Sequence, residues 1–150
     1  MQAGDIMHRD VKTVSADVTF TEAATTMHEY KISSVLVVDG ERPVGIVTER
    51  DVVNLVADGL DPAATRVGDR MTTDLATVDR RADLAEAARL MGERRIRHLP
   101  VVDRGALAGI ISIRDLTAWA VEELTGGHEL ADIERSSAAL AAAVEAKRRT

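Results

Sequence analysis

The chain has 150 residues, of which 45% are hydrophobic, and its formal net charge is −6. It is long enough for one compact domain that buries roughly 70% of its unfolded surface. It contains no cysteine, which excludes disulfides, iron–sulfur clusters, cysteine-zinc sites and thiol catalysis. The acidic balance argues against binding to nucleic acid, which needs a basic surface, but it is compatible with an anionic small ligand in a local positive pocket.

Residues 1–30 carry no long apolar run, and nowhere do about 18 apolar residues follow one another. We therefore expect no signal peptide, no membrane association and a cytoplasmic location. The four histidines lack metal-ligand spacing, and the phosphate-loop, dinucleotide-binding and nucleophile-elbow motifs are absent from the sequence. These observations predict a protein that is not an enzyme and that needs no metal or other cofactor.

An internal duplication dominates the sequence. When the chain is shifted by 64 residues, Gly4–Asp51 aligns with Gly68–Asp115 without a gap, and 19 of the 48 positions are identical. Each copy is too short to bury much core alone, so we expect the two copies to form one unit. The predicted division is 1–62 for the first repeat, 63–125 for the second and 126–150 for a C-terminal tail.

Each repeat has the same expected order of elements, β-α-β-β-α. The first helix opens with Thr19-x-x-Glu22 or Asp83-x-x-Glu86, which are patterns typical of helix N-caps. Apolar residues follow at helical spacing and predict one buried stripe per helix: Phe20, Ala23, Ala24 and Met27, then Leu84, Ala87, Ala88 and Met91. In chain order, the first repeat has extended segments at 11–14, 35–38 and 44–47, and the second has them at 75–78, 99–102 and 107–111.

A second helix is expected after Thr48 and, in the second repeat, from Ser112 to about Leu124, where Gly126-Gly127 ends it. The fold class is therefore α+β, with two repeats packed sheet to sheet about a pseudo-twofold axis. The tail from Glu129 to Arg149 reads as a further helix, either one that binds a partner helix or an ordinary C-terminal helix.

The same heptapeptide pattern lies between the last strand and the second helix of both repeats, as Gly45-Ile-Val-Thr48-Glu-Arg50-Asp51 and Gly109-Ile-Ile-Ser112-Ile-Arg114-Asp115. A hydroxyl and free N–H groups at a helix N-terminus favour a phosphate. A carboxylate one turn later can accept hydrogen bonds from both hydroxyls of a ribose. Thr48/Asp51 and Ser112/Asp115 are thus candidate nucleotide-binding residues. The same spacing also forms a capping box, which stabilises a helix without any ligand.

This pattern, Gly-h-x-Thr/Ser-x-x-Asp with h an apolar residue, resembles the cystathionine-β-synthase (CBS) repeat, and the resemblance extends over about residues 4–124. It implies a tandem CBS pair, or Bateman module, whose ligands include AMP, ADP and ATP. It also implies a homodimer that buries the second helices. S-adenosylmethionine and NAD(H) occupy similar pockets in the family and stay open as ligands.

The resemblance further implies which side chains complete each pocket. Basic residues before the second strand reach phosphate, which corresponds to Arg97 and His98, whereas their counterparts Ser33 and Ser34 are uncharged. The alternative for the basic run 94–98 is a solvated helix end. Because each pocket is shared between repeats, the base is expected to contact three residues of the opposite repeat: Val11, Lys12 and Ile32 for the Ser112/Asp115 site, and Leu75, Ala76 and Ile96 for the Thr48/Asp51 site.

These features predict that the Ser112/Asp115 site binds phosphate better than the Thr48/Asp51 site. Arg50 and Arg114 recur in both repeats and either meet phosphate or pair with an acid across the interface. The predicted function is a regulatory adenosine-nucleotide sensor that acts on an unidentified protein partner or through its dimer. The alternative is a ligand-free dimerisation module whose motif residues only cap helices.

Overall fold

The computed structural model describes residues 1–126. The tail at 127–150, including the predicted terminal helix, lies outside the described residues. Two three-stranded sheets form the centre of the molecule, and each has its strands in sequence order, with a parallel pair followed by an antiparallel hairpin. The strands are β1 (Thr13–Val14), β2 (Ser34–Asp39) and β3 (Arg42–Thr48) in the first sheet, and β4 (Val78–Asp79), β5 (His98–Asp103) and β6 (Ala106–Ser112) in the second.

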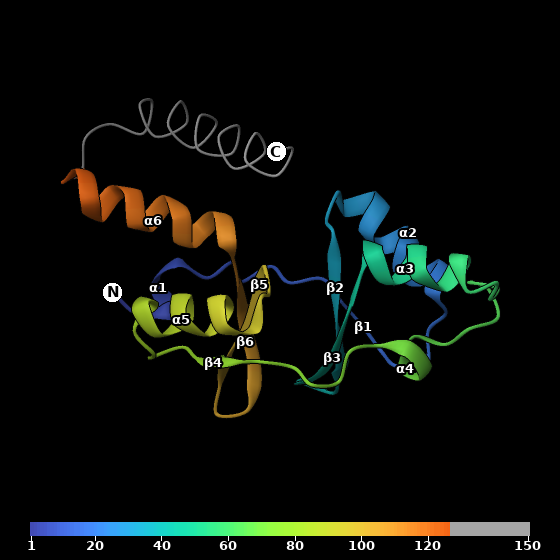
Figure 1. Ribbon diagram of the computed structural model, residues 1–150. Coiled ribbons are helices and arrows are strands. Elements are labelled where there is room, and N and C mark those ends of the chain that lie inside the picture. Colours follow the sequence, from blue (N-terminus) through green and yellow to red (C-terminus); the bar gives the residue numbers. More distant parts are fainter. Residues whose placement is uncertain (127–150) are drawn as a thin grey trace, which may run out of the picture.

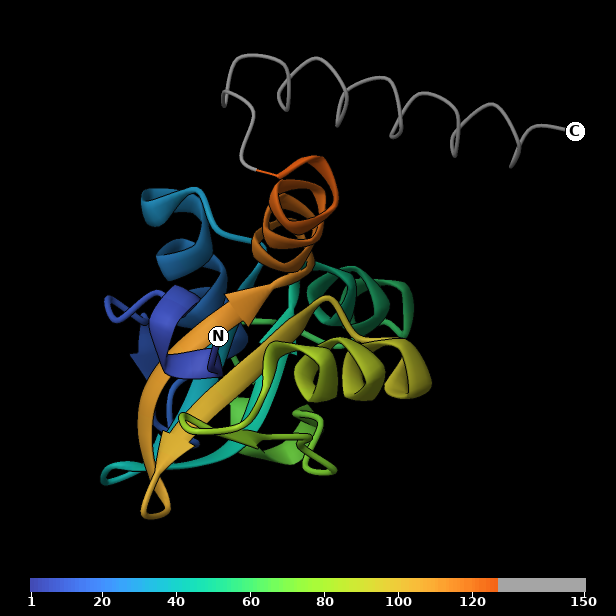
Figure 2. The same cartoon turned by 90° about the vertical axis from the view of Figure 1, so that its left-hand side faces the viewer.

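Four longer helices flank the sheets: α2 (Phe20–Tyr30), α3 (Glu49–Ala57), α5 (Leu84–Arg94) and α6 (Ile113–Thr125). The two sheets face each other in the middle, with α2 and α3 outside one sheet and α5 and α6 outside the other (Figure 1). Seen after a quarter turn, the β5–β6 hairpin lies in front of the β2–β3 hairpin (Figure 2). The hairpin ends are joined where the Leu107 N–H donates to the Glu41 carbonyl at 2.8 Å. The predicted α+β class and the sheet-to-sheet packing of two repeats are confirmed.

The helix starts follow the predicted caps. The Thr19 hydroxyl accepts from the Glu22 N–H, and the Glu22 carboxylate accepts from the Thr19 N–H at 2.7 Å, so both orphan donors are satisfied. Asp83 caps α5 differently, because its carboxylate accepts from the Ala85 N–H and Glu86 does not complete a box. The prediction that Ala88 belongs to the buried stripe is wrong, because Ala88 is exposed on α5. Leu90 packs against the core instead.

Two short helices, α1 (Ala3–Ile6) and α4 (Val67–Arg70), have no counterpart in the elements expected from sequence. Each packs on the core of the opposite repeat: Ala3 of α1 lies in the core around α5 and β5, and Val67 of α4 lies in the core around α2 and β2. Backbone bonds fix these positions, with the Ala3 N–H donating to Ala82 and the Val67 N–H donating to Val18, both at 2.8 Å. The two cores therefore exchange their N-terminal segments.

The segments that follow α1 and α4 pass directly over Gly109 and Gly45, the glycines that begin the two heptapeptides. A Cβ on Gly109 would lie 2.7 Å from the His8 carbonyl oxygen, and a Cβ on Gly45 would lie 2.6 Å from the Met71 sulfur. Real Cβ atoms do not approach other atoms so closely, so both positions need glycine for space. This passage brings the residues that follow α1 and α4 to the edges of the space between the sheets.

Candidate functional site

Two clefts open between the two sheets. We call them the Ser112 cleft, of about 510 Å³, and the Thr48 cleft, of about 730 Å³, after the hydroxyl residue that lines each. Both are large enough for a small ligand. The Ser112 cleft is lined by seven of the residues singled out in the sequence: Val11, Lys12, Ile32, Arg97, His98, Ser112 and Arg114. The Thr48 cleft is lined by eight of them: Thr48, Arg50, Asp51, Leu75, Ala76, Ile96, Arg97 and His98.

Each cleft takes one wall from each repeat. In the Ser112 cleft, Ser112 and Arg114 at the start of α6 face Val11 and Ile32 of the first repeat, and the Thr48 cleft has the corresponding exchange. The facing residues are about 80 to 100 positions apart in sequence in the Ser112 cleft and about 25 to 50 positions apart in the Thr48 cleft. The pseudo-twofold packing of the sheets is what brings them together.

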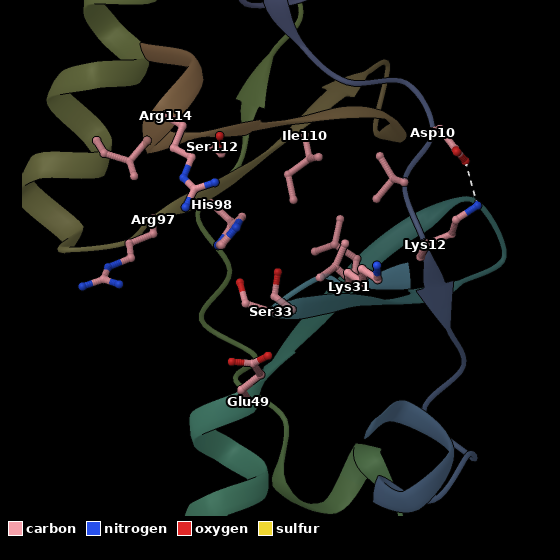
Figure 3. A pocket seen from close by; sticks show the side chains of 15 residues that line it. Asp10, Lys12, Lys31, Ser33, Glu49, Arg97, His98, Ile110, Ser112 and Arg114 are labelled. Carbon is pink, nitrogen blue, oxygen red and sulfur yellow. Dashed lines mark hydrogen bonds and ion pairs between the residues drawn. The ribbon is translucent and has the colours of Figure 1, made fainter. Parts of the chain in front are cut away.

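Arg97 and His98 line both clefts, so they do not belong to one site alone. In Figure 3 the His98 imidazole and the Arg114 guanidinium point into the space between the sheets, with Ser33 and Glu49 on the opposite wall. Burial of the His98 imidazole lowers its pKa below the ordinary 6.5, and the neighbouring Arg97 lowers it further, whereas the Asp115 carboxylate raises it. A neutral imidazole therefore faces the cleft near neutral pH, and an anion placed beside it would favour its protonation.

The hydroxyl–carboxylate pairs form the capping boxes that their spacing predicts. The Thr48 N–H donates to the Asp51 carboxylate at 2.8 Å, and the Ser112 N–H donates to the Asp115 carboxylate at 2.7 Å. The return bonds from the Asp51 and Asp115 N–H groups to the hydroxyls are both 3.3 Å. The capping interpretation is thus confirmed, and it is compatible with a ligand role because each hydroxyl also lines its cleft.

The two carboxylates differ in their surroundings. Asp51 lines the Thr48 cleft, whereas Asp115 is absent from the lining of the Ser112 cleft and its Oδ1 lies 2.9 Å from the Nε2 of His8. Burial raises the pKa of Asp115, but the hydrogen bonds from Ser112 and His8 outweigh this, and the pKa is lowered below 3.8. Asp115 is therefore ionised at neutral pH, and both of its oxygens can accept hydrogen bonds.

Arg50 and Arg114 each line their own cleft, and within residues 1–126 neither forms an ion pair with an acid. Lys12 is held more firmly: its ammonium group lies 3.0 Å from the Asp10 carboxylate and 4.3 Å from the centre of the Tyr30 ring. The Lys12 side chain is thus positioned at the rim of the Ser112 cleft by neighbours on the first repeat.

Several cleft residues were not among the predicted ligand contacts, although the sequence shows the contrast in charge between Ser33 and Ser34 and the basic run 94–98. The polar and charged ones are Asp10, Lys31, Ser33, Ser34, Glu49, Thr72, Asp74, Arg94 and Arg95. Lys31 and Arg95 occupy equivalent positions in the two repeats and both adopt left-handed backbone, with φ of 53° and 54°, at the C-terminus of the first helix. Their equivalence in the alignment at a 64-residue shift was the one available signal, because equivalent residues of the two repeats line the two clefts.

Among residues 1–126 there is no cluster of three or more histidine, aspartate or glutamate side chains that could hold a metal ion. None of the helices in this part of the chain is both long and apolar enough to cross a membrane.

A duplicated α+β unit with two equivalent clefts between its sheets defines a two-repeat ligand-binding module. The CBS domain model matches this chain twice, over residues 3–58 and 67–122, and the chain belongs to the CBS-domain family. The chain is 32% identical over 134 residues to the CBS domain-containing protein YhcV of Bacillus subtilis, covering 89% of this chain and 95% of YhcV. It is 38% identical over 119 residues to the uncharacterized protein MK0525 of Methanopyrus kandleri, where the match spans 77% of this chain but only 61% of MK0525.

Solved structures agree with this assignment. The CBS-domain protein ATU1752 of Agrobacterium tumefaciens superposes with a TM-score of 0.72 at 35% identity, covering 80% of this chain and 99% of that one. The CBS domain protein PAE2072 of Pyrobaculum aerophilum, solved in complex with AMP, gives a TM-score of 0.72 at 28% identity and covers 77% and 89% of the two chains.

Proposed function

We propose that the chain is a regulatory module that binds an adenosine nucleotide (AMP, ADP or ATP) between its two sheets and catalyses no reaction. The observation that carries the proposal is the convergence of a capped helix N-terminus and several cations on each cleft. The motif carboxylate Asp51 lines the Thr48 cleft, and Asp115 caps the helix whose N-terminus lines the Ser112 cleft. The AMP complex of the similar protein PAE2072 supports the ligand class. The proposal that the chain catalyses no reaction would be contradicted if the pure protein steadily turned over a nucleotide and a cleft variant lost that activity.

In the Ser112 cleft, the phosphate would lie against Arg97, His98 and Arg114. The Ser112 hydroxyl, which donates to Asp115 Oδ2 at 2.8 Å in the free protein, would turn its single proton to a phosphate oxygen. The ribose hydroxyls would reach the Asp115 carboxylate one helical turn later. The base would pack between the apolar side chains of Val11 and Ile32 on the opposite repeat. In the Thr48 cleft the corresponding residues are Thr48, Arg50 and Asp51 with Leu75, Ala76 and Ile96.

Beside the shared Arg97 and His98, each cleft has two cations that form no ion pair within residues 1–126: Arg114 and Lys31 in the Ser112 cleft, and Arg50 and Arg95 in the Thr48 cleft. The proposed preference of phosphate for the Ser112 cleft therefore rests on the remaining cation of each cleft, and Lys12 has a single contact with Asp10, at 3.0 Å. In the Thr48 cleft, Arg94 is already paired with Asp74 at 3.0 and 3.2 Å, which reduces its availability to a ligand. S-adenosylmethionine and NAD(H) are the rival ligands, and a parallel titration separates them from AMP, ADP and ATP.

Nucleotide affinity should depend on pH through His98. Phosphate beside the imidazole raises the His98 pKa from its lowered value, so binding takes up a proton and affinity increases as pH falls. The ratio of wild-type to His98→Gln affinity for AMP should therefore rise between about pH 8 and pH 6.5, by at most about tenfold per pH unit, the limit for one proton. Protonation of the phosphate itself affects both proteins equally and cancels in this ratio. A ratio that stays constant over this range would remove His98 from the phosphate site.

We also propose that the module is a homodimer that buries its second helices. On α3, Val53 and Val56 are 65% and 57% exposed, and on α6 Leu124 is 87% exposed. Val53→Glu/Val56→Glu should convert the dimer to a monomer in sedimentation velocity, because two charges cannot be buried unpaired in an interface. Thr25→Glu/His28→Glu on the exposed face of α2 has the same spacing and should leave the dimer intact. A wild-type monomer at micromolar concentration would refute the dimer.

The second candidate function, a ligand-free dimerisation module, is favoured by the capping boxes, since these alone explain the Thr/Ser-x-x-Asp spacing. A thermal-shift screen separates the two functions. If AMP, ADP or ATP is the ligand, 1 mM nucleotide should raise the melting temperature, because binding only to the folded state stabilises it. If no nucleotide raises it, the structural function is supported. The regulated partner and the cytoplasmic location stay predictions.

A further inference from the structure

Both oxygens of the Asp115 carboxylate already have partners within the protein. Oδ1 lies 2.9 Å from the His8 Nε2, and Oδ2 accepts from the Ser112 N–H at 2.7 Å and from the Ser112 hydroxyl at 2.8 Å. Two ribose hydroxyls need free carboxylate lone pairs in order to donate to them. The His8 contact therefore uses the oxygen that the proposed ribose site would need.

His8 is held at this position by its backbone and is free to move at its side chain. The His8 N–H donates to the Ile110 carbonyl at 2.9 Å, and the Ile110 N–H donates back at 3.0 Å, which fixes the segment against β6. The His8 side chain is nevertheless 65% exposed, compared with 19% for Asp115. The imidazole can thus turn into solvent without opening a cavity in the core.

The other repeat provides an internal comparison. Thr72 occupies the position equivalent to His8, and its backbone pairs with Ile46 in the same way, with both hydrogen bonds at 3.1 Å. Within the part of the chain that the structure describes, the Thr72 side chain makes no hydrogen bond to Asp51, and Asp51 faces its cleft. The difference between the two carboxylates therefore comes from one residue that breaks the repeat.

Resting on the proposed function, we infer that His8 is a specificity-determining latch that competes with the ribose for Asp115. A nucleotide in the Ser112 cleft must displace His8, whereas one in the Thr48 cleft meets no such competitor. The titratable and charged groups around the carboxylate are His8 from the segment after α1, His98 from β5 and, beside His98, Arg97. A nucleotide that binds in the Ser112 cleft gains ribose contacts to Asp115 but loses the His8–Asp115 bond. Its affinity there therefore depends mainly on the phosphate contacts.

The test uses His8→Thr, which gives this position the residue found in the other repeat, in an Asp51→Asn background that isolates the Ser112 cleft. His8→Thr should raise AMP affinity in calorimetry by about three- to tenfold, the range for a partly exposed hydrogen bond to a charged group. The gain for adenosine, which lacks phosphate, should be at least as large. His28→Thr, an exposed histidine on α2, should change neither affinity. Unchanged or weaker AMP binding in His8→Thr would overturn the latch.

A second readout needs no ligand and separates failure of the latch from failure of the proposed function. In the NMR spectrum of the free protein, Asp115→Asn should shift the ring signals of His8, while Asp51→Asn should not. If these signals do not shift in Asp115→Asn, the His8–Asp115 contact is absent in solution and the inference is wrong. If they respond but AMP binds to no variant, the contact exists, and it is the nucleotide function, and with it the competition, that fails.

Discussion

Gly109→Ala is expected to lower the free energy of unfolding by about 2–3 kcal/mol, the upper part of the range for overpacking a buried position. The added Cβ would lie 2.7 Å from the His8 carbonyl oxygen and 2.7 Å from the Met7 sulfur. The sulfur can move, but the carbonyl is fixed by the paired hydrogen bonds between His8 and Ile110. Urea unfolding followed by circular dichroism measures the loss.

Gly92→Ala is the matched control for this substitution. Gly92 lies within α5, and a Cβ there meets nothing within 4 Å, so alanine should be neutral or stabilise the fold by about 0.5–1 kcal/mol through its higher helix propensity. Equal midpoints for Gly109→Ala and wild type, with Gly92→Ala behaving as expected, would show that the segment after α1 does not pass so close to β6.

Removing the carboxylates should have the largest effect on binding. Asp115→Asn should weaken AMP binding to the Ser112 cleft by roughly 3- to 30-fold, because a charge-assisted hydrogen bond contributes about 1.5–3 kcal/mol and the competing His8 contact is removed with it. Asparagine keeps an oxygen that can accept from the Ser112 N–H, so the cap of α6 is largely preserved. Asp51→Asn should have the smaller effect if phosphate prefers the Ser112 cleft. Calorimetry with AMP on both single variants measures the difference.

Asp17→Asn is the control for lost charge, since the Asp17 side chain is 89% exposed and lies outside both clefts. It should bind AMP as the wild type does. If Asp51→Asn abolished binding while Asp115→Asn left it intact, the proposed preference would be reversed. Melting temperatures of the ligand-free variants show whether any loss comes from the fold instead.

The long elements could be predicted from the sequence because their signals are local. Helix α2 runs from Phe20 to Tyr30 as its cap at Thr19 and its apolar spacing indicate, and the 64-residue repeat transfers the same order to α5. Local signals were less reliable where burial depends on neighbours. Ala88 has the stripe spacing but is exposed, and the extended segments at 11–14 and 75–78 form strands only at 13–14 and 78–79.

The exchange of α1 and α4 between cores could not be predicted, because four-residue helices have no measurable periodicity and their contacts are long-range. The identical pairs Gly4/Gly68 and Met7/Met71 marked these segments as part of the repeat without showing which core they join. The His8–Asp115 contact spans 107 residues. The sequence does show that His8 aligns with Thr72, but this is one of the 29 positions at which the 48-residue alignment differs, and nothing local marks it as lying beside Asp115.

The central claim, that the clefts bind an adenosine nucleotide, is tested most directly by titration calorimetry of the full chain with AMP. The account predicts saturable heat with a micromolar Kd, about −8 kcal/mol, that is lost in Asp51→Asn/Asp115→Asn while the variant stays folded. No heat from AMP, repeated with ADP, ATP, S-adenosylmethionine and NADH, would contradict it and leave the two repeats as a structural dimerisation module.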